Sequence, residues 1–132
     1  LVAWKNQDHI IEAMKLLESE HAYLNLFIIG SGEMEEMWKQ KANQLEYSKV
    51  YFPGFVSVED LPAYYAATDL YIHPASMEPH SVAISEAIIM GCPIILSDRC
   101  GSYGPSDDVQ QNKNGYVFEF GNMEDLAQKI NL

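Results

Sequence analysis

Apolar residues follow two different spacings along this chain, one typical of helices and the other typical of buried strands. Between about residues 7 and 20, Ile10, Ile11, Met14 and Leu17 recur at the spacing that places them on one face of a helix. Further helices are predicted after Gly32, over residues 59–67 and 81–90, and from about Asn122. Short apolar runs predict strands over residues 24–29, 50–52, 70–73, 93–96 and 116–118.

Local signals mark where several of these elements begin and end. Ser57 followed by Asp60 is typical of a capping box at the start of the helix over 59–67. Gly91 stops the helix over 81–90, and Pro93 prevents its continuation. The run over 24–29 is typical of a strand that is buried on both faces. We expect His73 to make local hydrogen bonds at a strand end, and we expect six residues to belong to the core: Met34, Met37, Trp38, Leu45, Tyr64 and Tyr65.

The alternation of strands and helices predicts an α/β fold with three layers, in which helices cover both faces of a parallel sheet. Four loops rich in Gly, Pro, Ser and acidic residues follow the carboxyl ends of strands, at residues 30–32, 53–56, 73–78 and 97–101. In an open parallel sheet those ends share one edge, where ligands bind. The sequence therefore predicts a ligand crevice formed by these four loops.

Composition narrows the classes of partner. With 132 residues, 48% of them hydrophobic, the chain is long enough for one globular domain with a buried core. The formal net charge of −11 argues against binding to nucleic acid or to an anionic membrane surface. No apolar run approaches the roughly 18 residues of a membrane helix, and no signal peptide is visible. Cys92, expected in the core, and Cys100 lack metal-ligand spacing, which favours reduced thiols and a cytoplasmic protein.

Two carboxylates, Glu78 and Glu86, flank the predicted junction between a loop and a helix. The first N–H groups of that helix, at Ser81, Val82 and Ala83, have no partner within the helix and favour an anionic ligand. Together these features favour an anionic, hydroxyl-rich ligand such as a sugar nucleotide. Taken alone, Glu78 is more typical of a solvated loop acid. Glu86 lies in an apolar helix, where an unpaired buried carboxylate is costly, so a ligand or partner is expected.

The motifs in this region resemble those of one enzyme family. Residues 78–87 match the Glu-x7-Glu motif of the retaining GT-B glycosyltransferases of family 4, and residues 91–98 resemble the Gly-x-Pro-Val-strand-Ser-Asp segment that follows it. Further matches occur in the family's order and spacing at residues 28–32, 52–56, 64–65 and 114–115. The ordered set spans nearly the whole chain. It resembles the C-terminal, donor-binding half of these enzymes and implies the Rossmann-like fold of that half.

The resemblance assigns roles to acidic and basic residues. It implies that Glu86 accepts hydrogen bonds from the ribose hydroxyls of the donor, a task suited to a fixed carboxylate. Glu78 would lie beside the donor sugar as a catalytic residue. The amides of Ser81 and Val82 would face the diphosphate. Lys5 would neutralise the diphosphate and the charge that develops on the leaving group.

The same resemblance assigns the remaining contacts of the donor. Gly30 and Gly32 would belong to the donor site, and backbone groups around Phe55 and Val56 would hold the base. His80 would reach the sugar. The family usually has an aromatic residue and a Gly where this chain has His80 and Ser81. No cofactor or metal is expected, because the lysine and the helix amides replace a cation.

The whole protein implied by the resemblance is larger than this chain. Residues 1–132 would form a single nucleotide-sugar-binding domain that is truncated at both ends and lacks the first strand of its sheet and the family's Arg upstream of Lys5. An N-terminal domain of the same protein would bind the acceptor. The complete enzyme would transfer a hexose-type sugar to a glycan or glycolipid, as in polysaccharide biosynthesis, and the isolated chain would be inactive.

Two other functions remain open. A GT-B-like sugar-nucleotide epimerase would share the fold and the donor but would change the sugar without an acceptor. A non-catalytic flavodoxin-like binding domain would share the layered α/β fold. A signalling receiver domain with this fold needs an acidic cluster after its first strand and an aspartate after its third strand. The loops of this sequence do not offer these residues.

Overall fold

The structure, a computed structural model, describes residues 6–30, 32–76, 82–100 and 114–131, and only the backbone of Val82 and Ala83. All the predicted helices and strands are present, with ends that differ by a few residues. In chain order they are α1 (Asp8–Glu18), β1 (Asn25–Ile29), α2 (Glu35–Ala42), β2 (Lys49–Gly54), α3 (Leu61–Ala66), β3 (Tyr71–His73), α4 (Val82–Ile89), β4 (Ile94–Ser97), β5 (Gly115–Phe118) and α5 (Met123–Ile130).

The strands pair in parallel and form two sheets. β1 pairs with β2, and Phe27 lies opposite Tyr51 in that pairing. In the second sheet β4 lies between β3 and β5. The parallel pairing is as predicted. Among the described residues, however, β1 and β3 each have one strand partner and do not pair with each other.

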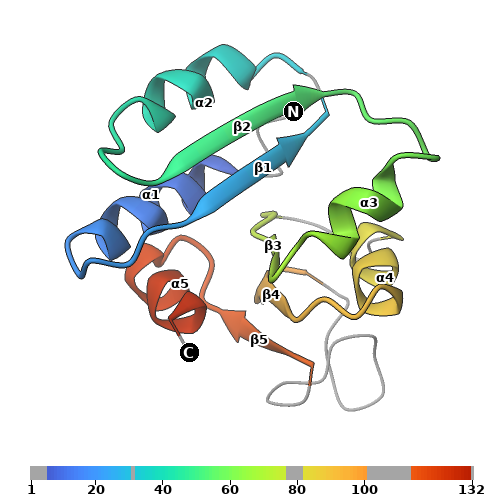
Figure 1. Ribbon diagram of the computed structural model, residues 1–132. Coiled ribbons are helices and arrows are strands. Elements are labelled where there is room, and N and C mark those ends of the chain that lie inside the picture. The colour runs from blue at the N-terminus through green and yellow to red at the C-terminus, as the bar shows by residue number, and fades with distance from the viewer. Residues whose placement is uncertain (1–5, 31, 77–81, 101–113, 132) are drawn as a thin grey trace.

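Helices cover both faces of the three-stranded sheet and produce the predicted three layers (Figure 1). On one face, Ile95 of β4 belongs to a buried cluster with Leu17 of α1 and Leu126 of α5. On the other face, Leu96 belongs to a cluster with Ile84 of α4. Neighbouring residues of a strand point to opposite faces, so β4 is buried along its whole length between the two layers of helices.

Helix α1 contributes to the cores of both sheets. Leu17 packs in the cluster beneath β4 and β5, whereas Ile11 packs with Ile28 of β1 and Trp38 of α2. The four residues of its predicted apolar stripe are all buried. The apolar face of this one helix therefore packs against both sheets and connects their cores.

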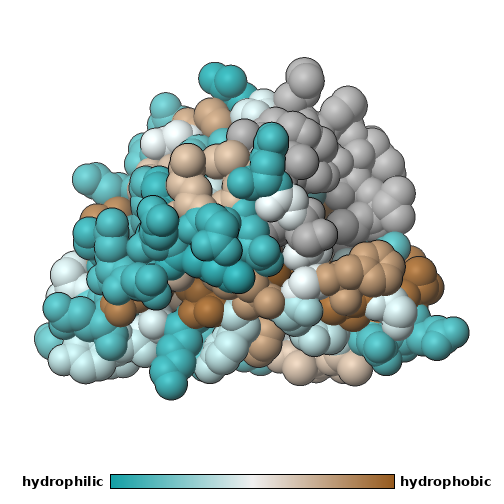
Figure 2. Space-filling view, turned by 90° about the horizontal axis from the view of Figure 1, so that it is seen from above, coloured by the Kyte–Doolittle hydropathy of each residue, from teal (hydrophilic) through white to brown (hydrophobic). Residues whose placement is uncertain are grey.

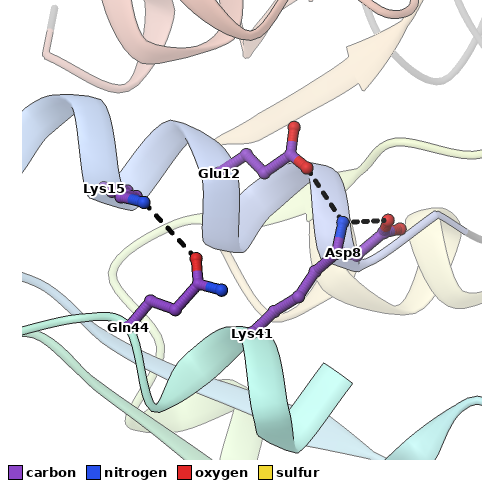
Figure 3. Close-up of polar contacts among 5 residues, drawn as sticks. All are labelled: Asp8, Glu12, Lys15, Lys41 and Gln44. Atoms are coloured by element: carbon purple, nitrogen blue, oxygen red, sulfur yellow. Dashed lines mark hydrogen bonds and ion pairs between the residues drawn. The ribbon is translucent and has the colours of Figure 1, made fainter. Parts of the chain in front are cut away.

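Polar contacts hold α2 and the segment after it against α1 (Figure 3). Lys41 Nζ of α2 lies 2.9 Å from Glu12 Oε1 and 3.3 Å from Asp8 Oδ2, both on α1. Lys15 Nζ of α1 donates to Gln44 Oε1 at 3.3 Å. These contacts lie beside the buried cluster of α1 and α2 and fix how the two helices sit along each other.

Glu18, at the end of α1, binds the connection between α2 and β2. Its carboxylate accepts hydrogen bonds from the backbone N–H groups of Glu46 at 3.1 Å, Tyr47 at 2.7 Å and Ser48 at 2.6 Å. The hydroxyl of Ser48 in turn accepts a hydrogen bond from the N–H of Leu24 at 2.9 Å. One carboxylate thus sets the position from which β2 starts beside β1.

Three sequence predictions about burial and capping are wrong. β1 is not buried on both faces: α1 and α2 pack on the face that carries Ile28, whereas Phe27 contacts the ring of Tyr64 of α3 and its side chain remains 53% exposed. Met37 is also 53% exposed, since the buried position of α2 is taken by its neighbour Trp38. The Ser57 hydroxyl donates to the Asp60 carboxylate at 3.0 Å instead of forming a capping box.

Two other predicted helix ends are confirmed, the end of α4 and the start of α5. Gly91 has a positive φ of +82°, a conformation that L side chains rarely adopt, and its N–H donates to the C=O of Ile88 at the end of α4. The side chain of Asn122 caps α5 by accepting a hydrogen bond from the N–H of Asp125. Both residues therefore end or begin a helix where the sequence placed them.

The surface is mostly hydrophilic on the face seen from above, with hydrophobic residues in smaller groups (Figure 2). In the described part of the chain, no helix combines the length and apolar character needed to cross a membrane.

Candidate functional site

The carboxyl ends of β1 and β2 are joined by a backbone hydrogen bond. The N–H of Gly30 donates to the C=O of Gly54 at 2.8 Å, and Gly54 lies opposite Ile29 in the pairing of the strands. Both glycines have positive φ, +111° at Gly30 and +78° at Gly54. The loops at residues 30–32 and 53–56 therefore begin side by side, as the parallel topology predicts.

Buried side chains join the carboxyl ends of β3 and β4. Ser97 Oγ donates to the C=O of Ala75 at 2.6 Å. Cys100 Sγ lies 3.5 Å from Ser97 Oγ and donates to the C=O of His73 at 3.7 Å. The predicted local hydrogen bond of His73 is present, since its Nδ1 lies 3.2 Å from the hydroxyl of Tyr71. Hydrogen bonds between buried residues thus connect the segments that follow β3 and β4.

A contact between distant parts of the chain brings the N-terminal segment to the same edge. The N–H of Ser76 donates to Asn6 Oδ1 at 3.1 Å, across 70 positions of sequence. Asn6 has a positive φ of 57°, a conformation that Asn tolerates better than most residues. Asn6 follows Lys5, and Ser76 lies two positions before Glu78. The structure therefore joins described residues that flank two of the predicted catalytic positions.

The carboxylate of Glu86 has a protein partner. The hydroxyl of Tyr65, on α3, donates to Glu86 Oε2, on α4, at 3.3 Å. Burial raises the pKa of Tyr65 to about 12, with the charge and hydrogen bond of Glu86 adding to the effect. The expectation that this carboxylate needs a partner in an apolar helix is met in part by Tyr65, a residue that the sequence analysis assigned to the core without a role at the site.

The structure describes six of the ten predicted site residues. Glu86 is half-buried beside Tyr65, and Phe55, at 84% exposed, follows the end of β2. Val82 opens α4. Gly30, Gly32 and Val56 lie in the loops that the Gly30–Gly54 hydrogen bond joins. Four predicted residues lie outside the described part of the chain: Lys5, Glu78, His80 and Ser81.

Two further residues of this edge were not found from the sequence. Asn6 and Ser97 act by hydrogen bonds to backbone groups of the loop after β3. The only sequence signal for Ser97 was its place in the motif over residues 91–98, and Asn6 gave no signal. Both were missed because their partners are far away in the chain.

Other features of the described residues do not suggest a competing site. No group of three or more His, Cys, Asp or Glu residues placed to hold a metal ion occurs among them. A shallow depression of about 530 Å³ lies where Leu16 meets residues 119–124. Its lining includes the carboxylates of Glu119 and Glu124 and no Lys or Arg, so it does not suit an anionic ligand.

Comparisons with known proteins agree in sequence and in structure. The sequence model of the family "Glycosyl transferases group 1" matches residues 1–132. The chain is 30% identical over 134 residues to an uncharacterized glycosyltransferase of Haemophilus influenzae, covering all of this chain and 36% of that protein. It is 30% identical over 131 residues to the poly(glycerol-phosphate) alpha-glucosyltransferase of Bacillus subtilis, covering 98% of this chain and 19% of that protein. The chain thus spans about a third or less of the length of these relatives.

Solved structures share the fold. The structure of TarM from S. aureus, in complex with Fondaparinux, alpha-GlcNAc-glycerol and UDP, matches with a TM-score of 0.85 and 27% identity, over 98% of this chain and 26% of TarM. The structure of HepE from Anabaena in complex with UDP-glucose matches with a TM-score of 0.82 and 26% identity, over 99% of this chain and 36% of HepE.

Proposed function

The chain belongs to the glycosyl transferases group 1 family, and from this premise we propose that it is the nucleotide-sugar donor domain of a retaining glycosyltransferase with the GT-B fold. The observation that carries the proposal is the match of the family over the entire chain. Support for the class of ligand comes from TarM and HepE, whose structures contain UDP and UDP-glucose and resemble this chain along nearly all of its length.

The proposed donor site lies at the carboxyl edge of the strands. Gly30, Gly32 and the backbone around Phe55 and Val56 hold the base end of the donor, in two loops joined by a hydrogen bond. Glu86 accepts hydrogen bonds from the ribose hydroxyls. A carboxylate suits this task because it offers two acceptor oxygens and its charge strengthens each bond.

The reacting end of the donor lies, in this proposal, between the N-terminal segment and the start of α4. Lys5 and the amides of Ser81 and Val82 take up the negative charge of the diphosphate as it leaves, so that no metal ion is needed. Glu78 lies beside the donor sugar as a catalytic residue, and His80 contacts the sugar. The hydrogen bond between Asn6 and Ser76 supports this arrangement, since it ties together chain segments next to Lys5 and Glu78.

The proposed reaction replaces one bond at the anomeric carbon by another on the same face of the sugar. The bond from the anomeric carbon to the diphosphate oxygen breaks, a bond to a hydroxyl oxygen of the acceptor forms, and the nucleoside diphosphate leaves with the electron pair and takes up the proton of that hydroxyl. We propose a hexose as the sugar and a glycan or glycolipid as the acceptor, in polysaccharide biosynthesis in the cytoplasm. The relatives that support such a role include the alpha-glucosyltransferase of B. subtilis.

The remainder of the full-length protein has two tasks in this proposal. It supplies the acceptor-binding domain, and it supplies a further strand that joins the two sheets between β1 and β3, each of which has one strand partner in the described residues. This proposal rests on the small share of its relatives that the chain covers. The isolated chain is then expected to be inactive as a transferase, because in this proposal the acceptor is bound by the rest of the full-length protein.

Calorimetric titration tests the proposed donor site. UDP, GDP and ADP, free and linked to sugars, are titrated into the chain and into its Glu86→Ala variant, with Ile89→Ala, an exposed position of the same helix, as the matched control. We expect one nucleoside diphosphate to bind, and Glu86→Ala to weaken it about ten- to a hundredfold through the loss of charge-assisted hydrogen bonds. Absence of binding by all of these compounds, or binding that Glu86→Ala leaves unchanged, contradicts the proposal.

A sugar-nucleotide epimerase remains the alternative enzyme. It would use the same edge of the fold and the same class of donor. Product analysis with the full-length protein separates the two, because only an epimerase changes the sugar of the donor when no acceptor is present.

A further inference from the structure

The contact between Tyr65 and Glu86 joins two helices, α3 and α4. Tyr65 lies on α3 and Glu86 on α4, and the hydroxyl donates to Oε2 at 3.3 Å. The family motif accounts for Glu86 but assigns no task to Tyr65. A hydrogen bond to the one carboxylate proposed to contact the ribose therefore needs an explanation of its own.

The hydroxyl of Tyr65 is a hydrogen-bond donor at neutral pH. With a pKa of about 12 it keeps its proton, and an ionised carboxylate can only accept hydrogen bonds. The direction of the bond is thus fixed: Tyr65 occupies one acceptor site on Glu86 and leaves the others for a ligand. An ionised carboxylate offers about four such sites.

Tyr65 itself is held firmly. Its side chain packs against the buried cluster that includes Ile84 of α4 and Leu96 of β4, and its ring lies 6.3 Å from the ring of Tyr71. Its backbone C=O accepts a hydrogen bond from Cys92 Sγ at 3.5 Å. The hydroxyl is therefore presented from a fixed ring, and a hydrogen bond to it restricts the rotation of the Glu86 side chain.

We propose that Tyr65 is a positioning residue that holds the Glu86 carboxylate in the orientation in which it binds the ribose hydroxyls of the donor, an inference that rests on the proposed function. A carboxylate that is already oriented loses less conformational entropy when the nucleotide binds. The distance of 3.3 Å is long for an O–H···O hydrogen bond. Such bonds in ligand-free sites often shorten when the ligand is bound.

The experiment compares Tyr65→Phe with Tyr64→Phe in the same chain. Tyr64 is the neighbouring, half-buried tyrosine of α3, and its ring contacts Phe27 instead. Both variants and the wild type are titrated with the ribonucleoside diphosphate that binds best and with its 2′,3′-dideoxy analogue, which lacks the hydroxyls. We expect Tyr65→Phe to weaken the ribonucleotide about fivefold, to leave the dideoxy analogue unchanged, and Tyr64→Phe to affect neither.

A double variant separates positioning from general damage. If Tyr65 acts through Glu86, then Tyr65→Phe causes no further loss of affinity once Glu86→Ala is present. Equal weakening of both nucleotides by Tyr65→Phe, or additive losses in the double variant, overturns the inference. If the wild type binds and Glu86→Ala weakens binding while Tyr65→Phe does not, the inference alone fails. If the wild type binds no nucleoside diphosphate, the proposed function fails and the inference fails with it.

Discussion

Replacing Glu18 by Gln tests whether one carboxylate anchors the start of β2. Glu18 accepts one N–H at Oε1, from Glu46, and two at Oε2, from Tyr47 and Ser48. A Gln side chain keeps one acceptor oxygen but turns an NH2 donor toward another donor, and it removes the charge that strengthens the remaining bonds. Because the carboxylate is partly exposed, we expect a loss of about 1–2 kcal/mol in the free energy of unfolding at pH 7.

The effect should depend on pH in a defined direction. Burial raises the pKa of Glu18, but the hydrogen bonds from the backbone N–H groups of Ser48, Tyr47 and Glu46 outweigh it, and the net pKa lies below its usual 4.5. A carboxyl whose pKa is lower in the folded state adds stability above the pKa of the unfolded state and loses it as pH falls through the folded value. The difference between wild type and Glu18→Gln should therefore be complete at pH 7 and shrink below about pH 4.5.

Urea unfolding, followed by circular dichroism at pH 7, 5 and 3.5, measures this difference. Glu20→Gln is the matched control, since Glu20 lies just beyond the same helix and is exposed, with no side-chain hydrogen bond or ion pair among the described residues. We expect Glu20→Gln to stay within about 0.5 kcal/mol of the wild type. The anchoring argument fails if both variants lose the same stability at pH 7, or if the loss in Glu18→Gln is as large at pH 3.5 as at pH 7.

Three further predictions concern single contacts, each measured by thermal or urea unfolding. Asn6→Gly should lower the free energy of unfolding by about 1 kcal/mol, because the N–H of Ser76 loses its acceptor, whereas Asn6→Asp keeps an acceptor and should stay close to the wild type; equal losses would contradict this role. Lys41→Met should cost about 0.5–1 kcal/mol in low salt and less in 1 M NaCl, since its two ion pairs are partly exposed, and a loss that does not respond to salt would argue for packing. Gly91→Ala should cost about 1–2 kcal/mol because of its positive φ, although the space for a methyl group is open; no change would show that this helix end tolerates a side chain.

The elements could be predicted because their signals are local. The stripe of α1 repeats within eleven residues, and Gly91 ends α4 through its own backbone conformation. Burial of Phe27 could not be predicted in the same way. Whether its face of β1 is covered depends on which elements lie beyond the strand: α1 and α2 pack on the other face, and the ring of Tyr64 covers Phe27 only in part. The predicted burial of Met37 was wrong for a related reason, since a helix that carries both Met37 and Trp38 can turn only one of these neighbours to the core.

The sequence identified the site residues that belong to the motif, but not their contacts with the rest of the chain. Glu86 was identified as a carboxylate that needs a partner, yet its partner Tyr65 lies 21 positions away, on another helix. Asn6 and Ser76 are 70 positions apart, and Ser97 and Ala75 are 22 apart. The last two contacts form where the parallel strands bring their carboxyl ends to one edge, whereas the first joins two helices. The topology could be predicted, but the side chains that meet there could not.

The distribution of charge explains why the donor would need more than this chain. Residues 50–98, which include α3, β3, α4, β4 and all of β2 except its first residue, Lys49, contain no Lys or Arg, and the net charge of the chain is −11. A diphosphate approaching this edge would meet helix amides and Lys5, but also a field that repels it. In the proposed site the amides and the carboxylate of Glu86 would supply geometry, Lys5 and the amides would neutralise part of the diphosphate charge, and the remainder of the full-length protein would neutralise the rest. We therefore expect the isolated chain to select the correct nucleotide while binding it weakly, and the full-length protein to bind the same nucleotide more tightly.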